Sequence, residues 1–86
     1  MQKMEAATQQ RHRVYLSTLI HRTSGERVSA IITRLWFDGC EITTHDLFAD
    51  SEHIEIEFDM MGRVRSRVTG SANLVLSVRF LEECPV

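Results

Sequence analysis

IEIEFDMMGRVRSRV, residues 54–68, carries the clearest structural pattern in the chain. From residue 54 to 59 an apolar residue alternates with an acidic one, and from 63 to 68 arginine alternates with valine or serine. Successive side chains of a β-strand point to opposite faces, so a period of two indicates a strand with one buried face. The stretch therefore predicts two strands joined by a turn at residues 59–62.

The outward faces of these two strands carry opposite charges. The expected register pairs Phe58 with Val64, Glu57 with Arg65 and Glu55 with Arg67. Opposite charges directly across a ladder stabilise a sheet by roughly 0.2–1 kcal/mol. Three arginines on one strand face also suit phosphate binding. Because surface charge runs are usually solvated pairs, we interpret this stripe as structural salt bridges.

Short apolar runs broken by turn residues predict four further strands. Their expected ranges are 14–22, 27–35, 40–44 and 74–80, with turns at 23–26 and 70–73. The residues expected to face inward in the last strand and in the loop 45–52 are Leu74, Leu76, Val78, Phe80, Leu47 and Phe48. Six short antiparallel strands predict an all-β fold, a small closed β-barrel, because closure removes the exposed edges of a small sheet.

The chain has 86 residues, which is the length of one small domain. Residues 1–10 are polar and without a sustained period, so we expect a flexible N-terminal arm there. Residues 11–86 are expected to form the single barrel domain. No internal repeat divides this range.

Composition and charge narrow the class of protein. The net charge is −2 and the pI is about 6.0, whereas general nucleic-acid binders carry a basic balance. Cys40 and Cys84 do not make a disulfide framework, and residues 1–10 hold no apolar leader. No apolar run approaches the roughly 20 residues that span a bilayer. These features predict a cytoplasmic protein with free thiols.

The motifs of common enzymes and metal sites are missing from the sequence. There is no Gly-x-Ser-x-Gly segment and no glycine-rich phosphate loop. His12, His21, His45 and His53 lack the paired spacing of a structural zinc site. We therefore expect no catalysis, no metal and no cofactor.

Trp36 and Phe37 are adjacent aromatic residues at the end of an expected strand. Since neighbouring strand residues point to opposite faces, one ring can join the core while the other stays exposed. An exposed aromatic ring suits stacking on a base or anchoring a partner. The alternative is that Trp36 covers the rim of the barrel.

The segment ITRLWFDGCEI, residues 32–42, resembles the second signature of PilZ domains, which are bacterial receptors for cyclic di-GMP. That signature is Asp/Asn-x-Ser-x-x-Gly at the end of the second strand, and an Arg-x-x-x-Arg motif precedes the first strand. The layout from about Gln9 to Leu81 is similar to the family's, including the Gly-Arg-Val-Arg segment that begins at Gly62 and the final Val78-Arg79-Phe80. The resemblance implies a six-stranded barrel with cyclic di-GMP across one side.

The ligand motifs of the family are only partly kept. In the second signature Gly39 matches, but Arg34 occupies the Asp/Asn place and Trp36 the Ser place. A guanidinium has no acceptor for a guanine edge, and an indole is far larger than a hydroxymethyl group.

The first motif is also broken. Taking Arg13 as its second arginine puts Gln9 at the first place, and taking Arg11 as its first puts Tyr15 at the second place. Each lost arginine removes a charge-assisted contact, commonly worth about 1.5–3 kcal/mol.

Three functional interpretations remain open. The first is a PilZ-like adaptor that has lost tight cyclic di-GMP binding and meets a protein partner through Trp36 and Arg34. The second is an atypical cyclic di-GMP receptor whose ligand-binding residues are Arg11, Arg13, Arg34, Trp36 and Gly39. The third is a small oligonucleotide-binding barrel that uses Tyr15, Trp36 and the arginine stripe.

Overall fold

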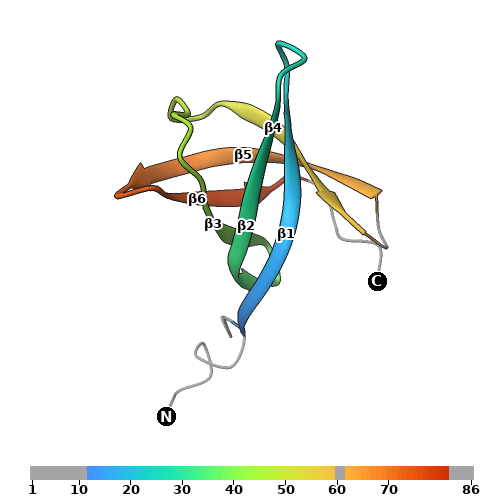
Figure 1. Ribbon diagram of the computed structural model, residues 1–86, viewed down its shortest axis with the longest axis vertical. Coiled ribbons are helices and arrows are strands. Elements are labelled where there is room, and N and C mark those ends of the chain that lie inside the picture. Colours follow the sequence, from blue (N-terminus) through green and yellow to red (C-terminus); the bar gives the residue numbers. More distant parts are fainter. Residues whose placement is uncertain (1–11, 60–61, 82–86) are drawn as a thin grey trace.

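The computed structural model describes residues 12–59 and 62–81, which form six strands and no helix (Figure 1). The strands are β1 (His12–Arg22), β2 (Arg27–Trp36), β3 (Gly39–Thr43), β4 (His53–Phe58), β5 (Gly62–Ala72) and β6 (Val75–Phe80). Every neighbouring pair is antiparallel and the order β1-β2-β3-β6-β5-β4 closes into a barrel. The predicted six-stranded barrel is therefore confirmed. The arm expected at residues 1–10, and Arg11, lie outside the described residues.

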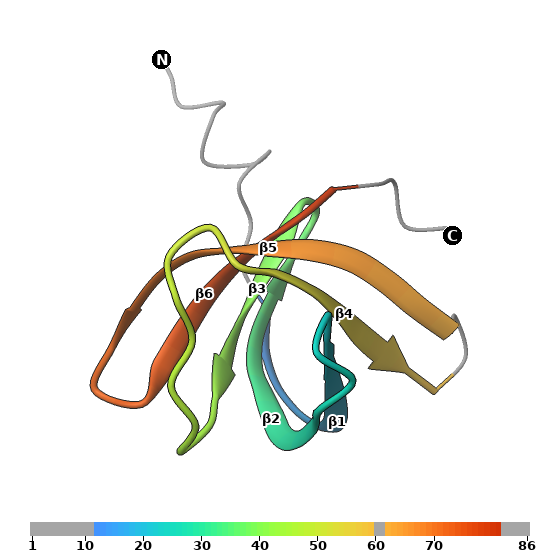
Figure 2. The ribbon, with the colours of Figure 1, turned by 90° about the horizontal axis from the view of Figure 1, so that it is seen from above.

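The barrel consists of two three-stranded meanders that pair with each other along their edges. β1, β2 and β3 are joined in succession, as are β4, β5 and β6. Two seams between strands distant in sequence close the barrel, β3 with β6 and β1 with β4. Figures 1 and 2 show these two groups of strands around a common interior.

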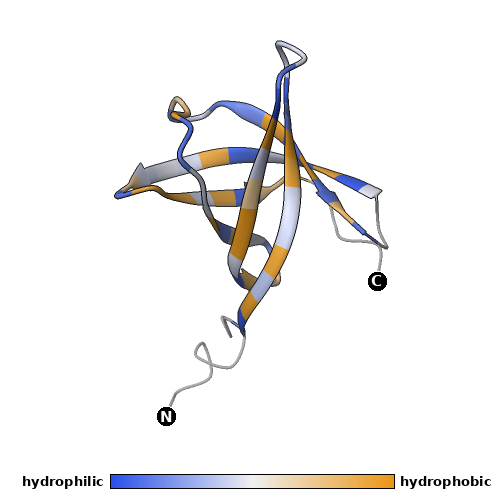
Figure 3. Ribbon diagram, in the orientation of Figure 1, coloured by the Kyte–Doolittle hydropathy of each residue, from blue (hydrophilic) through white to orange (hydrophobic). Residues whose placement is uncertain are grey.

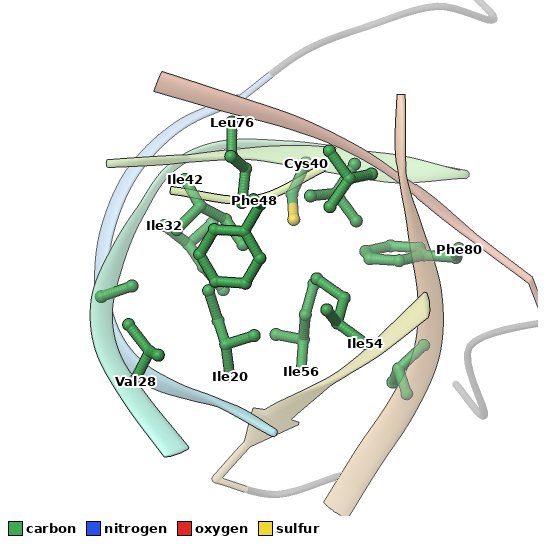
Figure 4. Packing of buried hydrophobic residues seen from close by; sticks show 14 of the residues in the cluster. Ile20, Val28, Ile32, Cys40, Ile42, Phe48, Ile54, Ile56, Leu76 and Phe80 are labelled. Atoms are coloured by element: carbon green, nitrogen blue, oxygen red, sulfur yellow. The ribbon is translucent and has the colours of Figure 1, made fainter. Parts of the chain in front are cut away.

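The core comes from the inward face of every strand. Figure 3 shows hydrophobic and hydrophilic residues alternating along the strands. Figure 4 shows the inward side chains meeting in one cluster. Its most completely buried members are Ile20, Ile32, Ile42, Ile56, Leu76, Val64, Val68 and Cys40. Burying one such aliphatic side chain contributes about 1.5–3 kcal/mol, so this cluster is the main source of the barrel's stability.

The loop between β3 and β4 covers one end of the core with a single aromatic ring. Phe48 is buried, with 8% of its surface exposed, and it lies within the cluster in Figure 4. Leu47 was expected to face inward as well, but 87% of its surface is exposed. Adjacent residues of an extended loop point to opposite sides, so only one of the two reaches the core.

The β4–β5 register differs by two residues from the expected one. Phe58 pairs with Gly62, which places Glu57 opposite Arg63 and Glu55 opposite Arg65. Gly62 has a φ of 78°, a left-handed conformation that lets β5 begin immediately after a short connection. A shift of two keeps every side chain on its predicted face. It changes the arginine that lies opposite each glutamate of β4.

The β5–β6 turn is tighter than expected. β5 continues to Ala72 through an irregularity between Val68 and Gly70, and only Asn73 and Leu74 connect the strands. Leu74 was expected on the buried face, but it occupies the turn and 52% of its surface is exposed. The bulge places one extra residue in β5 opposite β6, and the strand continues beyond it to Ala72.

Candidate functional site

The strand register places five residues in one row across the outer face of the barrel. The directly opposed pairs are Trp36 with Gly39, Gly39 with Arg79, Arg79 with Arg67, and Arg67 with His53. Each of the five residues comes from a different strand, and the row crosses the β3–β6 seam. Sequence reasoning had selected Trp36 and Gly39, but it had assigned Arg67 to a structural salt bridge with Glu55 and had not selected Arg79. Only the non-local β3–β6 pairing brings them beside Gly39.

The neighbouring row contains the other two described candidates. Arg13 on β1 lies directly opposite Arg34 on β2, and Arg34 lies opposite Glu41 on β3. Nε of Arg34 is 3.5 Å from Oε1 of Glu41, a long ion pair at a partly exposed position. The structure thus places Arg13 beside Arg34, whereas Arg11 lies outside the described residues.

Trp36 occupies the space above Gly39. A Cβ placed on Gly39 would lie 3.2 Å from Nε1 and 3.4 Å from Cε2 of Trp36, and it would clash with the carbonyl oxygen of Val78. The residue at position 39 must therefore be glycine, because the backbone of β6 approaches it closely. The indole ring is half-buried against this bare stretch of main chain.

Exposed apolar side chains lie near this end of the barrel. Phe37 has 82% of its surface exposed, and Trp36 is half-buried over Gly39 without joining the core cluster that one of the two rings was expected to join. Tyr15 and Leu16 are also exposed, at the irregularity in β1 between Arg13 and Leu16. Exposed aromatic rings beside arginines are the composition of protein-binding surfaces.

The arginine stripe on β5 is only partly a set of structural ion pairs. Nη1 of Arg63 is 3.4 Å from Oε1 of Glu55, an exposed pair that contributes little. Arg65, which lies opposite Glu55, also has an interaction partner. Arg67 faces His53 and Arg79 instead of the expected Glu55, and the described part of the chain offers it no ion pair.

A concavity in the barrel surface shares His53 with the row that runs from Trp36 to His53. It is an open groove of about 640 Å³ beside the β1–β2 turn, and Arg27, His53, Arg63 and Leu81 are among its lining residues. Several of its other charged side chains form hydrogen bonds or ion pairs within the protein.

Arg22 and Glu52 form an ion pair with two hydrogen bonds next to this groove. The guanidinium donates to the carboxylate at 2.7 and 2.9 Å, and the backbone N–H of Ala49 donates to it at 3.0 Å. The hydrogen bond from Arg22 lowers the pKa of Glu52 below its usual value, against partial burial, which raises it. The Arg22 guanidinium also lies 4.2 Å from the centre of the Phe48 ring.

His21 is held in the same region by a carboxylate from β4. Its Nε2 is 2.7 Å from Oε1 of Glu57, and the hydroxyl of Thr18 donates to the carbonyl oxygen of Glu57. These contacts join β1 to β4 beyond the end of their short ladder. The groove is thus lined largely by groups that stabilise the fold.

In residues 12–59 and 62–81, no group of three or more His, Cys, Asp or Glu side chains is placed to hold a metal ion. No helix long and apolar enough to cross a membrane is present in the same residues.

Comparison with known proteins identifies no family for this chain. No protein-family model matches it, and no curated protein matches it. The assignment to a function therefore rests on the geometry of the outer-face rows and on the resemblance carried by residues 32–42.

Proposed function

We propose that this chain is a PilZ-like, non-catalytic adaptor domain of cyclic di-GMP signalling that binds a protein partner and has weak or no affinity for the nucleotide. The observation that carries the proposal is Arg34, which stands where the second signature of the family has a hydrogen-bond acceptor, Asp or Asn, and lies directly opposite another arginine, Arg13. A guanidinium cannot accept a hydrogen bond from a guanine edge.

The position of Trp36 supports the same conclusion. Its indole covers Gly39, the one residue that matches the second signature. A nucleotide lying on this face would have to displace the ring or stack on its outer surface. A half-buried tryptophan flanked by arginines and exposed apolar residues has the composition of a binding hot spot for a protein.

The partner surface extends from Trp36 and Arg34 to Phe37. Its charge is positive and its centre is aromatic, so the partner's contacting surface is expected to be acidic at its rim and apolar at its centre. Arg34 already has Glu41 beside it. A partner carboxylate would compete with Glu41 for the same guanidinium.

The decisive experiment is titration of cyclic di-GMP into the purified protein, followed by calorimetry and by amide NMR spectra. The adaptor proposal predicts no heat and unchanged spectra at high protein concentration. Binding near micromolar affinity or tighter would contradict it. Such binding would make the domain a receptor.

The partner surface is tested by substitution. Trp36→Ala and Arg34→Gln should each abolish or strongly weaken the co-purification of a partner protein from the host cell with this domain. Leu47→Ala, which changes an exposed residue on the β3–β4 loop, should not. Unchanged interactions for a folded Trp36→Ala variant would reject this surface.

An atypical cyclic di-GMP receptor is the second candidate, because of one observation. Arg79 lies beside Gly39 in the ladder, and Arg13 and Arg34 lie in the next row, so several cations surround an aromatic ring. Phosphates and a stacked guanine suit that set of groups. The same titration separates the two candidates, since Trp36→Ala would then weaken nucleotide binding.

A further inference from the structure

Arg67 and Arg79 form an unusual pair on the outer face. They are directly opposed across the β5–β6 ladder, and both side chains are exposed. Like charges at directly opposed positions destabilise a sheet, because the side chains start only about 5 Å apart. A protein without a use for this pair would be more stable with a neutral residue at either position.

No carboxylate among the described residues neutralises the pair. Their other direct neighbours in the row are His53, which adds no negative charge, and Gly39, which has no side chain. The two nearest carboxylates in the ladder lie diagonally. Glu55 is engaged by Arg63, and Glu41 by Arg34.

We propose that Arg67 and Arg79 together bind a phosphate monoester. A guanidinium presents a planar set of donors that matches phosphate oxygens in a bidentate manner. Two adjacent positive charges match the charge of about −1.5 to −2 on a phosphate monoester at neutral pH. A carboxylate or a phosphodiester carries one negative charge and would leave half of the pair uncompensated.

The surroundings of the pair suit such a ligand. His53 lies beside Arg67 and can add a third donor on the β4 side. On the β3 side Gly39 has no side chain of its own, and the indole of Trp36 lies over it, so the indole borders the site next to Arg79. The inference goes beyond the proposed adaptor function, since it concerns a phosphate monoester and not cyclic di-GMP.

The experiment is an NMR titration of the labelled protein with inorganic phosphate, compared with chloride at equal ionic strength. We expect saturable shifts of the amides of residues 67 and 79 with phosphate, and only small linear shifts with chloride. Arg67→Gln and Arg79→Gln should each weaken the phosphate affinity about ten-fold. Arg63→Gln removes the same charge from the same strand, and it should change the affinity by less than about two-fold.

Folding is controlled within the same series. Arg67→Gln relieves a repulsion, so its unfolding midpoint in chloride should equal or exceed that of the parent protein. Arg67→Lys provides a further variant that keeps the charge but loses the planar fork, and it should also weaken phosphate binding.

Two further probes distinguish the sources of the phosphate. Glycerol phosphate represents a small molecule, and a phosphoserine peptide without other charged side chains represents a phosphorylated protein. Binding of either that is tighter than that of inorganic phosphate and depends on Arg67 supports the site and identifies the source. Linear shifts with every phosphate probe, or an equal loss in Arg63→Gln, would overturn the proposal. Failure here leaves the cyclic di-GMP titration and the Trp36→Ala result unaffected.

Discussion

Glu52 positions Arg22 over the Phe48 ring that covers one end of the core. Its pKa is lowered in the folded protein, first by the hydrogen bond from Arg22. Stability from a carboxylate with a lowered pKa is fully present above the unfolded value, about 4.3 for glutamate, and is lost as the pH falls through the folded value. The Arg22–Glu52 pair therefore stabilises the fold at neutral pH, and this stabilisation is lost in acid.

Glu52→Gln should lower the free energy of unfolding at pH 7 by about 1 kcal/mol, and the difference from the parent should shrink below about pH 4. Urea denaturation across this pH range measures both. Glu26→Gln is the control, since Glu26 is more exposed and lies 3.4 Å from the same arginine. An equal loss for both variants, or no pH dependence, would contradict the assignment.

Leu74 is a bulky residue in a left-handed conformation. Asn73 and Leu74 form the two-residue turn between β5 and β6, with φ values of 54° and 68°. A turn of this type favours Asn-Gly, and a non-glycine residue in it costs roughly 1–2 kcal/mol.

Leu74→Gly should therefore raise the free energy of unfolding by about 1 kcal/mol, measured by chemical denaturation. Leu47→Gly, at an exposed residue without a positive φ, should be neutral or slightly destabilising. A destabilised Leu74→Gly variant would mean that the exposed leucine makes contacts that outweigh the strain.

Among the elements, β3 and β6 approach each other closely at Gly39. A Cβ there meets the carbonyl oxygen of Val78, and a backbone atom in a ladder cannot move aside. Gly39→Ala should cost at least about 2 kcal/mol, detectable as a lowered denaturation midpoint. Gly70→Ala is the matched control, because nothing lies near its Cβ and its φ is not positive, so it should change stability by less than about 1 kcal/mol.

The sequence predicted the strands better than their pairing. Alternation placed residues 54–58 and 63–68 on the correct faces, because the period of two depends on neighbouring residues alone. The β4–β5 register was wrong by two, since alternation is unchanged by such a shift and Gly62 decides where the ladder starts. The exposed position of Leu74 was missed because a bulge leaves no clear mark in the pattern.

The candidate site shows the same limit. Trp36 and Gly39 were found because a local signature contains them, and Arg34 because it stands within that signature. Arg79 could not be placed beside Gly39 without knowing that β3 pairs with β6. A contact between strands distant in the sequence has no local signal.

At the scale of the whole molecule, the two seams differ in length. β1 and β4 share three paired positions, centred on His21 and Glu55, whereas β3 and β6 share five. Contacts such as the His21–Glu57 hydrogen bond extend the shorter seam. The barrel is expected to open first between β1 and β4, because fewer ladder bonds must break there.

Hydrogen exchange under native conditions tests this expectation. Amides whose bonds cross the β1–β4 seam should exchange through an opening of lower free energy than those between β3 and β6. Glu57→Gln should widen the difference. Equal protection of both seams would show that the barrel opens only as a unit.

The closure of the barrel also sets the order of events during folding. The four hairpins form between neighbours in the sequence, whereas the seams must bring distant strands together, and such non-local pairing is slow. The row from Trp36 through Gly39 to Arg79 spans the β3–β6 seam. A refolding chain therefore gains its hairpins before it gains this surface, and recovery of binding should lag behind recovery of strand signal by the time the seam needs to close.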